Sequence, residues 1–263
     1  TLELQEPSLL CLQSFIAGRW TDADDRKTIP VHNPATGKIV GNVANLGKAE
    51  TIRAVEAARD ARPAWRSKTA HDRATILKRW HDLLVQHADD LALILTHEQG
   101  KPLRESKGEV LYAASFVEWY AEEGKRVAGQ TASCPLPGKR TLVLKQPVGV
   151  CAAVTPWNFP AAMITRKVAP GLAAGCPVIV KPSELTPLTA LAIARLAEEA
   201  GIPESVLQIV TGQPQEIGEV LTTHPDIRKF SFTGSTAVGR LLAARCASTV
   251  KRVSLELGGH APF

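Results

Sequence analysis

The chain has 263 residues, of which 44% are hydrophobic and 22% charged, and its formal net charge is +5. These values are typical of a folded globular chain of one or two domains and exclude a disordered or collagen-like protein. No apolar run approaches the roughly 20 residues of a membrane span. The basic residues are scattered among acids, which argues against nucleic-acid binding and favours a small anionic partner.

The five cysteines are odd in number, widely spaced and form no CxxC pair. This pattern argues against a disulfide framework and against a metal site, and it favours a reducing compartment. We therefore expect a cytoplasmic location, or the mitochondrial matrix if a transit peptide has been removed, and no membrane partner. The chain starts at Thr1 and ends at Phe263, so we also expect a fragment.

The first half of the chain predicts short strands followed by long helices. Residues 12–46 contain strand-like runs and a Pro/Gly turn, whereas residues 49–126 place apolar side chains at helical spacing. Thr69 is expected to cap one helix, because its hydroxyl can accept from first-turn N–H groups. The following proline-containing segment, with a strand-like run at 141–145, predicts an extended arm.

From Val148 onward, short apolar strands alternate with amphipathic helices. The predicted strands cover residues 148–154, 178–181, 206–210, 227–232 and 252–257, and the predicted helices cover 162–173, 187–200, 215–221 and 235–246. Continuous apolar strands are expected where helices cover both faces of a sheet. Strict alternation then predicts an α/β fold with a doubly wound parallel sheet.

Ligands bind such sheets at the carboxyl ends of the strands, where loops lead into helices. Four segments directly follow a predicted strand: Thr155–Pro160, Lys181–Glu184, Thr233–Ser235 and Glu256–Gly259. These loops are therefore the candidate site.

Two of the loops suggest a phosphate site and a ribose site. The glycines at 234 and 239 have the spacing of a phosphate loop, but the Lys-Ser/Thr pair of a triphosphate loop is missing. A glycine turn remains, and the helix that follows it can hold a pyrophosphate at its N-terminus. Lys181 and Glu184 could bind ribose hydroxyls. An ordinary strand-to-helix turn and a solvated Lys-Glu pair are the alternatives.

The other two loops suggest acid-base and oxyanion chemistry. Asn158 lies between Trp157 and Phe159 in a turn with two prolines, so its amide is a pre-oriented donor of the kind that an oxyanion hole needs. Glu256 lies between leucines, and apolar surroundings would raise its pKa toward that of a general base at neutral pH. An Asn that satisfies its own turn and a Glu that caps nearby backbone are the structural alternatives.

In this order and spacing, TPWNFP, KPSE, FTGS and LELGG resemble the NAD(P)-dependent aldehyde dehydrogenase superfamily. The earlier segments FIAGRW, NPATG and EQGKP agree, so the resemblance covers essentially the whole chain. Residues 114–123 and 161–167 are most similar to succinate-semialdehyde dehydrogenases. The resemblance implies a Rossmann-like cofactor domain and oxidation of a small carboxylated aldehyde to its acid.

The resemblance also implies a role for each candidate residue. Asn158 would donate to the oxyanion, Glu256 would be the general base, and Lys167 would be a further catalytic residue. Arg166 would bind the substrate carboxylate through its planar, permanently charged guanidinium. NAD is favoured over NADP, because Glu184 would repel a 2′-phosphate. The implied cofactor-binding residues are Thr155, Pro156, Trp157, Asn158, Lys181, Pro182, Ser183, Glu184, Gly234, Ser235 and Leu257.

The family pattern divides the chain into four parts. Residues 1–128 would supply the N-terminal strands and helices of the cofactor domain, 129–147 an arm for self-association into dimers or tetramers, and 148–257 the Rossmann-like core. Residues 258–263 would begin a catalytic domain that is otherwise missing.

Two departures from the pattern leave alternatives open. His260 stands where the family usually carries Lys or Asn, and the family's nucleophilic cysteine lies downstream of Glu256, beyond Phe263. The chain alone is therefore expected to be inactive. It is either part of a succinate-semialdehyde dehydrogenase, part of a related enzyme such as a glutarate-semialdehyde dehydrogenase, or a free-standing, non-catalytic dinucleotide-binding or regulatory domain.

Overall fold

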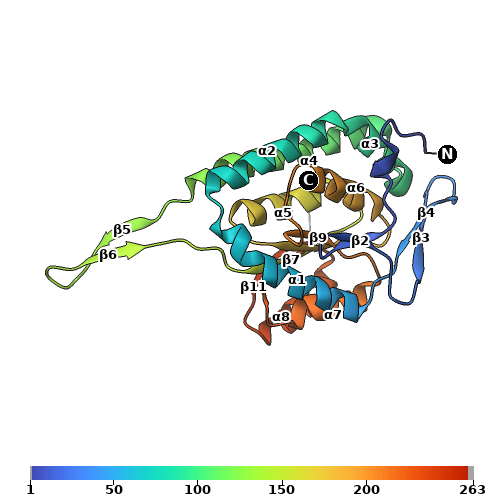
Figure 1. Ribbon diagram of the computed structural model, residues 1–263. Coiled ribbons are helices and arrows are strands. Elements are labelled where there is room, and N and C mark those ends of the chain that lie inside the picture. The colour runs from blue at the N-terminus through green and yellow to red at the C-terminus, as the bar shows by residue number, and fades with distance from the viewer. Residues whose placement is uncertain (1, 260–263) are drawn as a thin grey trace.

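A seven-stranded sheet lies at the centre of the computed structural model, which describes residues 2–259 (Figure 1). Its strands follow the order β11-β10-β7-β8-β9-β1-β2. The five from β7 to β11 are parallel, and β1 and β2 join them antiparallel. Their bounds are β1 Ser14–Ile16, β2 Arg19–Thr21, β7 Val150–Val154, β8 Val178–Lys181, β9 Leu207–Ile209, β10 Ile227–Gly234 and β11 Arg252–Leu257.

The parallel part confirms the predicted α/β sheet, and each strand and helix beyond residue 148 ends within two residues of its predicted bounds. The sequence did not predict that the N-terminal strands extend this same sheet. They do so because Phe15 of β1 pairs with Ile209 of β9, the last parallel strand on that side.

Helices cover both faces of β7, β8 and β9 (Figure 1). One face packs on α5 (Ala162–Ala173) and α6 (Leu188–Glu199), and α2 (Ala70–Gln86), α3 (Ala88–Gln99) and α4 (Leu103–Glu123) lie over these two. On the other face, α1 (Lys48–Ser67) packs on these three strands. The same layer continues with α7 (Pro214–Thr223) on β10 and α8 (Thr236–Ala247) on β10 and β11.

Successive strand residues belong to separate cores. Ala153 and Val180 pack on the α5 side, whereas Ala152 and Ile179 pack on the α1 side. This alternation follows from the two-residue period of a strand, and it explains why these strands are apolar throughout.

The helical cover stops at the last two strands of the sheet. Among the described residues, α8 covers one face of β11, while Ser254 and Glu256 face a cavity on the other. The expectation that helices cover both faces is therefore wrong for β11. The reason is visible in its sequence, because Ser254 and Glu256 alternate with Val253 and Leu255, which pack against the α1-side core.

Two hairpins lie outside the sheet. Strands β3 (Thr28–His32) and β4 (Ile39–Ala44) form one, and β5 (Gln130–Ser133) and β6 (Arg140–Val143) form the other, which projects from the body (Figure 1). The second confirms the extended arm, although it is a two-stranded hairpin rather than a single strand.

Short helices and caps complete the chain. The 3-10 turns are η1 (Pro7–Leu9) and η2 (Gly124–Arg126). Thr69 caps α2 as predicted, and its hydroxyl accepts from the Asp72 N–H at 3.1 Å. In the described part of the chain, no helix is long and apolar enough to cross a membrane.

Candidate active site

Three of the four predicted loops meet in one cleft at the carboxyl edge of the sheet. This strand-end cleft has a volume of about 610 Å³ and is lined by residues 156–159, 233–235 and 256–258, together with Met163. The fourth loop lies beside it, because the Thr155 N–H donates to the Lys181 carbonyl at 3.2 Å. Parallel strands bring these loops together because their carboxyl ends share one edge.

The N-terminus of α8 opens at the strand-end cleft. Ser235 is its N-cap, and the hydroxyl accepts from the Val238 N–H at 3.3 Å. A Cβ at Gly234 would lie 2.5 Å from the Phe232 ring, so the turn into the helix requires glycine. The first turn carries no acidic residue. An anion such as a pyrophosphate therefore meets a helix end with free N–H groups and no acidic side chain in its own first turn.

Lys181 and Glu184 form a pair next to this helix end. The Lys181 side chain is 3% exposed, and its Nζ lies 2.7 Å from Glu184 Oε2. Burial lowers the pKa of Lys181 and is opposed by Glu184. Burial acts to raise the pKa of Glu184, but the hydrogen bond and charge of Lys181 outweigh it and lower that pKa. The pair is thus a buried lysine held by a half-buried glutamate, not a fully solvated loop pair.

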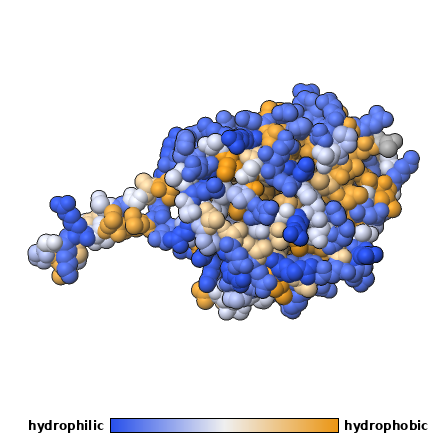
Figure 2. Space-filling view, in the orientation of Figure 1, coloured by the Kyte–Doolittle hydropathy of each residue, from blue (hydrophilic) through white to orange (hydrophobic). Residues whose placement is uncertain are grey.

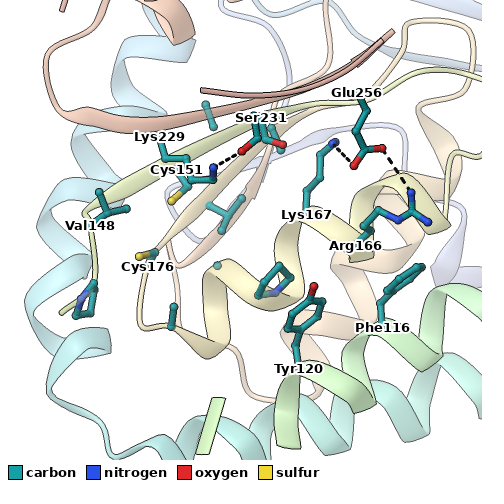
Figure 3. A pocket seen from close by; sticks show the side chains of 18 of the residues that line it. Phe116, Tyr120, Val148, Cys151, Arg166, Lys167, Cys176, Lys229, Ser231 and Glu256 are labelled. Carbon is teal, nitrogen blue, oxygen red and sulfur yellow. Dashed lines mark hydrogen bonds and ion pairs between the residues drawn. The ribbon is translucent and has the colours of Figure 1, made fainter. Parts of the chain in front are cut away.

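A second cavity opens on the uncovered face of β10 and β11 (Figure 3). This basic cavity has a volume of about 650 Å³, and three cations line it: Arg166 and Lys167 from α5 and Lys229 from β10. Glu256 lines both the basic cavity and the strand-end cleft. The carboxylate therefore stands where the two cavities meet.

The surroundings of Glu256 differ from the prediction. Its side chain is 49% exposed, and its carboxylate lies 3.4 Å from Arg166 Nη1 and 3.9 Å from Lys167 Nζ (Figure 3). The expected apolar environment is wrong, because the flanking leucines point to the opposite face of an edge strand. The carboxylate therefore lies beside two cations and not among apolar side chains.

Arg166 and Lys167 occupy different environments on α5. Arg166 donates to the Tyr112 hydroxyl at 2.9 Å, and its guanidinium carbon lies 4.9 Å from the centre of the Phe116 ring. Lys167 is buried, which lowers its pKa, and the charge of Glu256 acts in the opposite direction. Arg166 therefore presents a permanent charge held by two aromatic residues of α4, whereas Lys167 is a buried amine next to a carboxylate.

Asn158 lies in the strand-end cleft, but its aromatic neighbours do not enclose it. Trp157, Asn158 and Phe159 are all exposed. The Asn158 carbonyl accepts from Lys101 Nζ at 2.9 Å, and the same Nζ lies 4.0 Å from the centre of the Phe159 ring. Besides the rings and prolines of its own segment, this turn is therefore held by Lys101, which the sequence did not predict.

Several residues at the site escaped the sequence prediction. Lys101, Glu109, Tyr112 and Phe116 come from α4 and the loop before it, far from the strand ends in sequence. A usable signal was present at Glu109, a carboxylate on the apolar stripe that Val110 and Ala113 share. A charge on the buried face of a helix usually has a partner.

The polar groups at the strand ends fit a dinucleotide. They combine a helix N-terminus, a Lys-Glu pair and the Thr155 hydroxyl, which is buried without a hydrogen-bond partner within residues 2–259. No described cysteine lines the strand-end cleft, and Cys151 and Cys176 line the basic cavity instead. No metal-binding group of His, Cys, Asp or Glu occurs among the described residues. His260 lies outside them.

Known proteins resemble the chain along its whole length. It is 56% identical over 262 residues to glutarate-semialdehyde dehydrogenase of Pseudomonas aeruginosa and 54% identical to the NADP(+) succinate-semialdehyde dehydrogenase GabD of Escherichia coli. Each alignment covers 100% of this chain and 54% of the relative. The crystal structure of succinate-semialdehyde dehydrogenase from Burkholderia pseudomallei matches with a TM-score of 0.98 and 61% identity, over 99% of this chain and 54% of that one.

The chain thus spans about half the length of these relatives. The profile of the aldehyde dehydrogenase family matches residues 20–263. Together with the parallel sheet and its strand-end cleft, this match places the chain in the aldehyde dehydrogenase family.

Proposed function

We propose that this chain is the cofactor-binding part of a dehydrogenase that oxidises a small carboxylated aldehyde to its acid. The observation that supports this most strongly is the place of Glu256, at the junction of a dinucleotide-like cleft and a basic cavity. A general base in that position can reach a group bound in either cavity.

Each residue then has a defined task. Asn158 donates to the oxygen that gains negative charge, and Glu256 removes a proton from the attacking water. Lys167, a buried amine 3.9 Å from that carboxylate, holds it in place. NAD(P), when bound, accepts the hydride. That water hydrolyses the thioester that a cysteine thiolate would form with the aldehyde once the hydride has left, and it releases the acid and the thiol. None of the described cysteines lines the strand-end cleft.

For the cofactor, the proposed contacts are the α8 N-terminus with Gly234 and Ser235 for the pyrophosphate, and Lys181 with Glu184 for the ribose. Residues 155–158, Pro182, Ser183 and Leu257 complete the contact surface. The E. coli relative is named for NADP(+), yet we propose NAD for this chain. The support is the Glu184 carboxylate beside Lys181, which suits a ribose diol and repels a 2′-phosphate.

For the substrate, we propose that Arg166 binds the distal carboxylate. Tyr112 and Phe116 hold the guanidinium at the mouth of the basic cavity, within 3.4 Å of Glu256. The relatives are named for succinate semialdehyde and for glutarate semialdehyde, which differ by one methylene. Succinate semialdehyde is our first candidate and glutarate semialdehyde the second.

We also propose how the protein assembles and in which compartment it lies. The exposed arm supports self-association as a dimer or tetramer. Five cysteines without a disulfide in the structure support a reducing compartment, either a cytoplasm or a mitochondrial matrix.

The test compares aldehydes with and without the acid group. The complete gene product that carries residues 1–263 is assayed for cofactor reduction with succinate semialdehyde and with butanal. We expect kcat/KM to favour the carboxylated aldehyde by about 100-fold, because a charged Arg-carboxylate pair at a partly buried site contributes about 3 kcal/mol. Arg166→Ala should abolish this preference, and Tyr112→Phe should weaken it.

Two outcomes would count against the role proposed for Arg166. Equal kcat/KM values for the two aldehydes in the native protein, or an unchanged preference in Arg166→Ala, would contradict the assignment. Titration of the 263-residue chain with NAD by calorimetry separates the cofactor role, since binding that is lost in Lys181→Ala would stand even without turnover.

A further inference from the structure

We propose that a buried ion pair, Lys101 with Glu109, positions the Asn158 loop. The pair lies outside the strand ends, on the loop before α4 and on α4 itself. Between them, its two side chains hold both ends of the segment from Asn158 to Ala162. The geometry of this clamp is independent of the reaction, and only the consequence for Asn158 rests on the proposed function.

Glu109 holds the far end of the loop. Its side chain is 1% exposed, and Oε1 accepts from the backbone N–H groups of Ala161 at 2.9 Å and Ala162 at 3.3 Å. These groups begin α5, whose N-cap residue Ala161 has no side chain that could satisfy them. A carboxylate at this place also interacts favourably with the positive end of the helix dipole.

Lys101 holds the near end of the loop. Its Nζ pairs with Oε2 of Glu109, donates to the Asn158 carbonyl at 2.9 Å and lies 4.0 Å from the centre of the Phe159 ring. The side chain is 11% exposed. Because one ammonium group contacts Glu109, Asn158 and Phe159 together, it fixes the loop to α4.

The loop needs such an anchor because its own side chains do not provide one. Trp157, Asn158 and Phe159 are exposed, and the Asn158 amide makes no hydrogen bond within residues 2–259. An oxyanion donor is effective only when it is held in place before the charge develops. The pair therefore acts on Asn158 through the backbone, as a positioning device that contacts neither substrate nor cofactor itself.

Three variants and one control test the clamp. Lys101→Met removes the ammonium group, Lys101→Arg keeps a cation, and Glu109→Gln keeps an acceptor for the helix N–H groups but removes the charge. Lys107→Met is the control, because Lys107 lies on the same helix α4 and pairs with Asp89 at 2.6 Å, but both side chains are exposed and the pair does not include a residue of the loop. Hydrogen exchange of residues 157–162 is measured in the 263-residue chain, and kinetics in the complete gene product that carries it.

We expect faster exchange at residues 157–162 in Lys101→Met and Glu109→Gln, with the exchange of the central strands unchanged. We also expect kcat to fall about tenfold or more, with the KM for the aldehyde and the Kd for the cofactor within about threefold of the native values, as for loss of a transition-state contact. Lys101→Arg should retain more activity than Lys101→Met. Lys107→Met should resemble the native protein in each measurement.

Two results would overturn the proposal. One is unchanged exchange at residues 157–162 in both Lys101→Met and Glu109→Gln. The other is an increase in exchange spread evenly over the chain, which would indicate a purely structural pair. If the native protein oxidises no aldehyde, the proposed function fails, but the exchange measurement still decides whether the clamp exists.

Discussion

Each cation near the strand ends has a carboxylate partner. Lys181 pairs with Glu184, Lys101 with Glu109, and Arg166 with Glu256. The Lys101–Glu109 pair is buried, and so is Lys181, whereas Glu184 is half-buried. Removing the partner of one of the buried groups leaves a charge without compensation in a poorly solvated place. The third pair is open to both cavities, and its charges remain available to a ligand. The pair that we propose to position the Asn158 loop is therefore the most buried of the three, and the pair that we propose to face a substrate is the most exposed.

At the same scale, Glu184 should decide the cofactor preference. Glu184→Ser removes the carboxylate and frees Lys181 Nζ, which lies 2.7 Å from it, to contact a 2′-phosphate. We expect the ratio of NADP affinity to NAD affinity, measured by calorimetry on the 263-residue chain, to rise about tenfold. Glu198→Ser is the matched control, because Glu198 forms a similar pair with Arg195 on α6. A ratio that does not rise in Glu184→Ser would show that another residue discriminates.

At the scale of elements, helix α6 is capped by a side chain from another helix. Its N-cap residue is Pro187, which has no capping group, and Glu98 of α3 accepts instead from the N–H groups of Leu188 at 2.7 Å and Thr189 at 2.8 Å. Burial raises the pKa of Glu98 to about 8, against the opposing effect of these hydrogen bonds. The same arrangement recurs where Glu109 of α4 caps α5. Glutamates of α3 and α4 thus fix the starts of both helices that pack on that face of the sheet.

The raised pKa of Glu98 predicts a pH-dependent stability. A carboxyl that holds its proton more tightly in the folded chain than in the unfolded one, where the pKa is 4.5, stabilises the fold most at low pH. This contribution is lost as the pH rises from about 4.5 through about 8, with a slope of about 1.4 kcal/mol per pH unit between these values. Glu98→Gln cannot titrate and should remove that slope.

The measurement is the free energy of unfolding by urea at pH values from 5 to 8.5. Glu105→Gln serves as a control, because Glu105 is an exposed carboxylate in the first turn of α4. If the native chain and Glu98→Gln lose stability in parallel over this range, Glu98 is ionised in the fold throughout and the raised pKa is wrong.

At the scale of the whole molecule, the arm projects from the body, and we expect the body to fold without it. Every residue of β5 and β6 is exposed, and the exposed apolar side chains of the arm include Leu142 and Leu144 (Figure 2). These exposed apolar side chains are the feature of the arm that supports the proposed self-association.

Deleting the arm should change assembly but not folding. Replacing residues 130–143 by a short Gly-Ser linker is feasible because Gly129 lies beside Val143 at the base of the hairpin. We expect an unchanged melting temperature and a lower mass in light scattering. A variant with Leu142 and Leu144 changed to Ser keeps the hairpin and should also lose association. An unchanged mass in both variants would place the contact elsewhere.

The sequence by itself determined the α/β fold, the order of its strands and helices beyond residue 148, and three of the loops that meet in the strand-end cleft. It did so because apolar periodicity and glycine turns are local signals, and because parallel strands end at one edge by necessity. The motif pattern also placed the chain in its family.

Only the tertiary structure decided what surrounds these residues. Glu256 is half exposed between Arg166 and Lys167 because β11 is an edge strand. No local sequence pattern predicts that position in the sheet. Lys101 reaches the Asn158 carbonyl and Glu109 reaches the Ala161 N–H from more than 50 residues earlier in the chain, since α4 packs on α5. Charge partners that come from distant elements are set by packing, and packing is the part of the fold that a single sequence does not display.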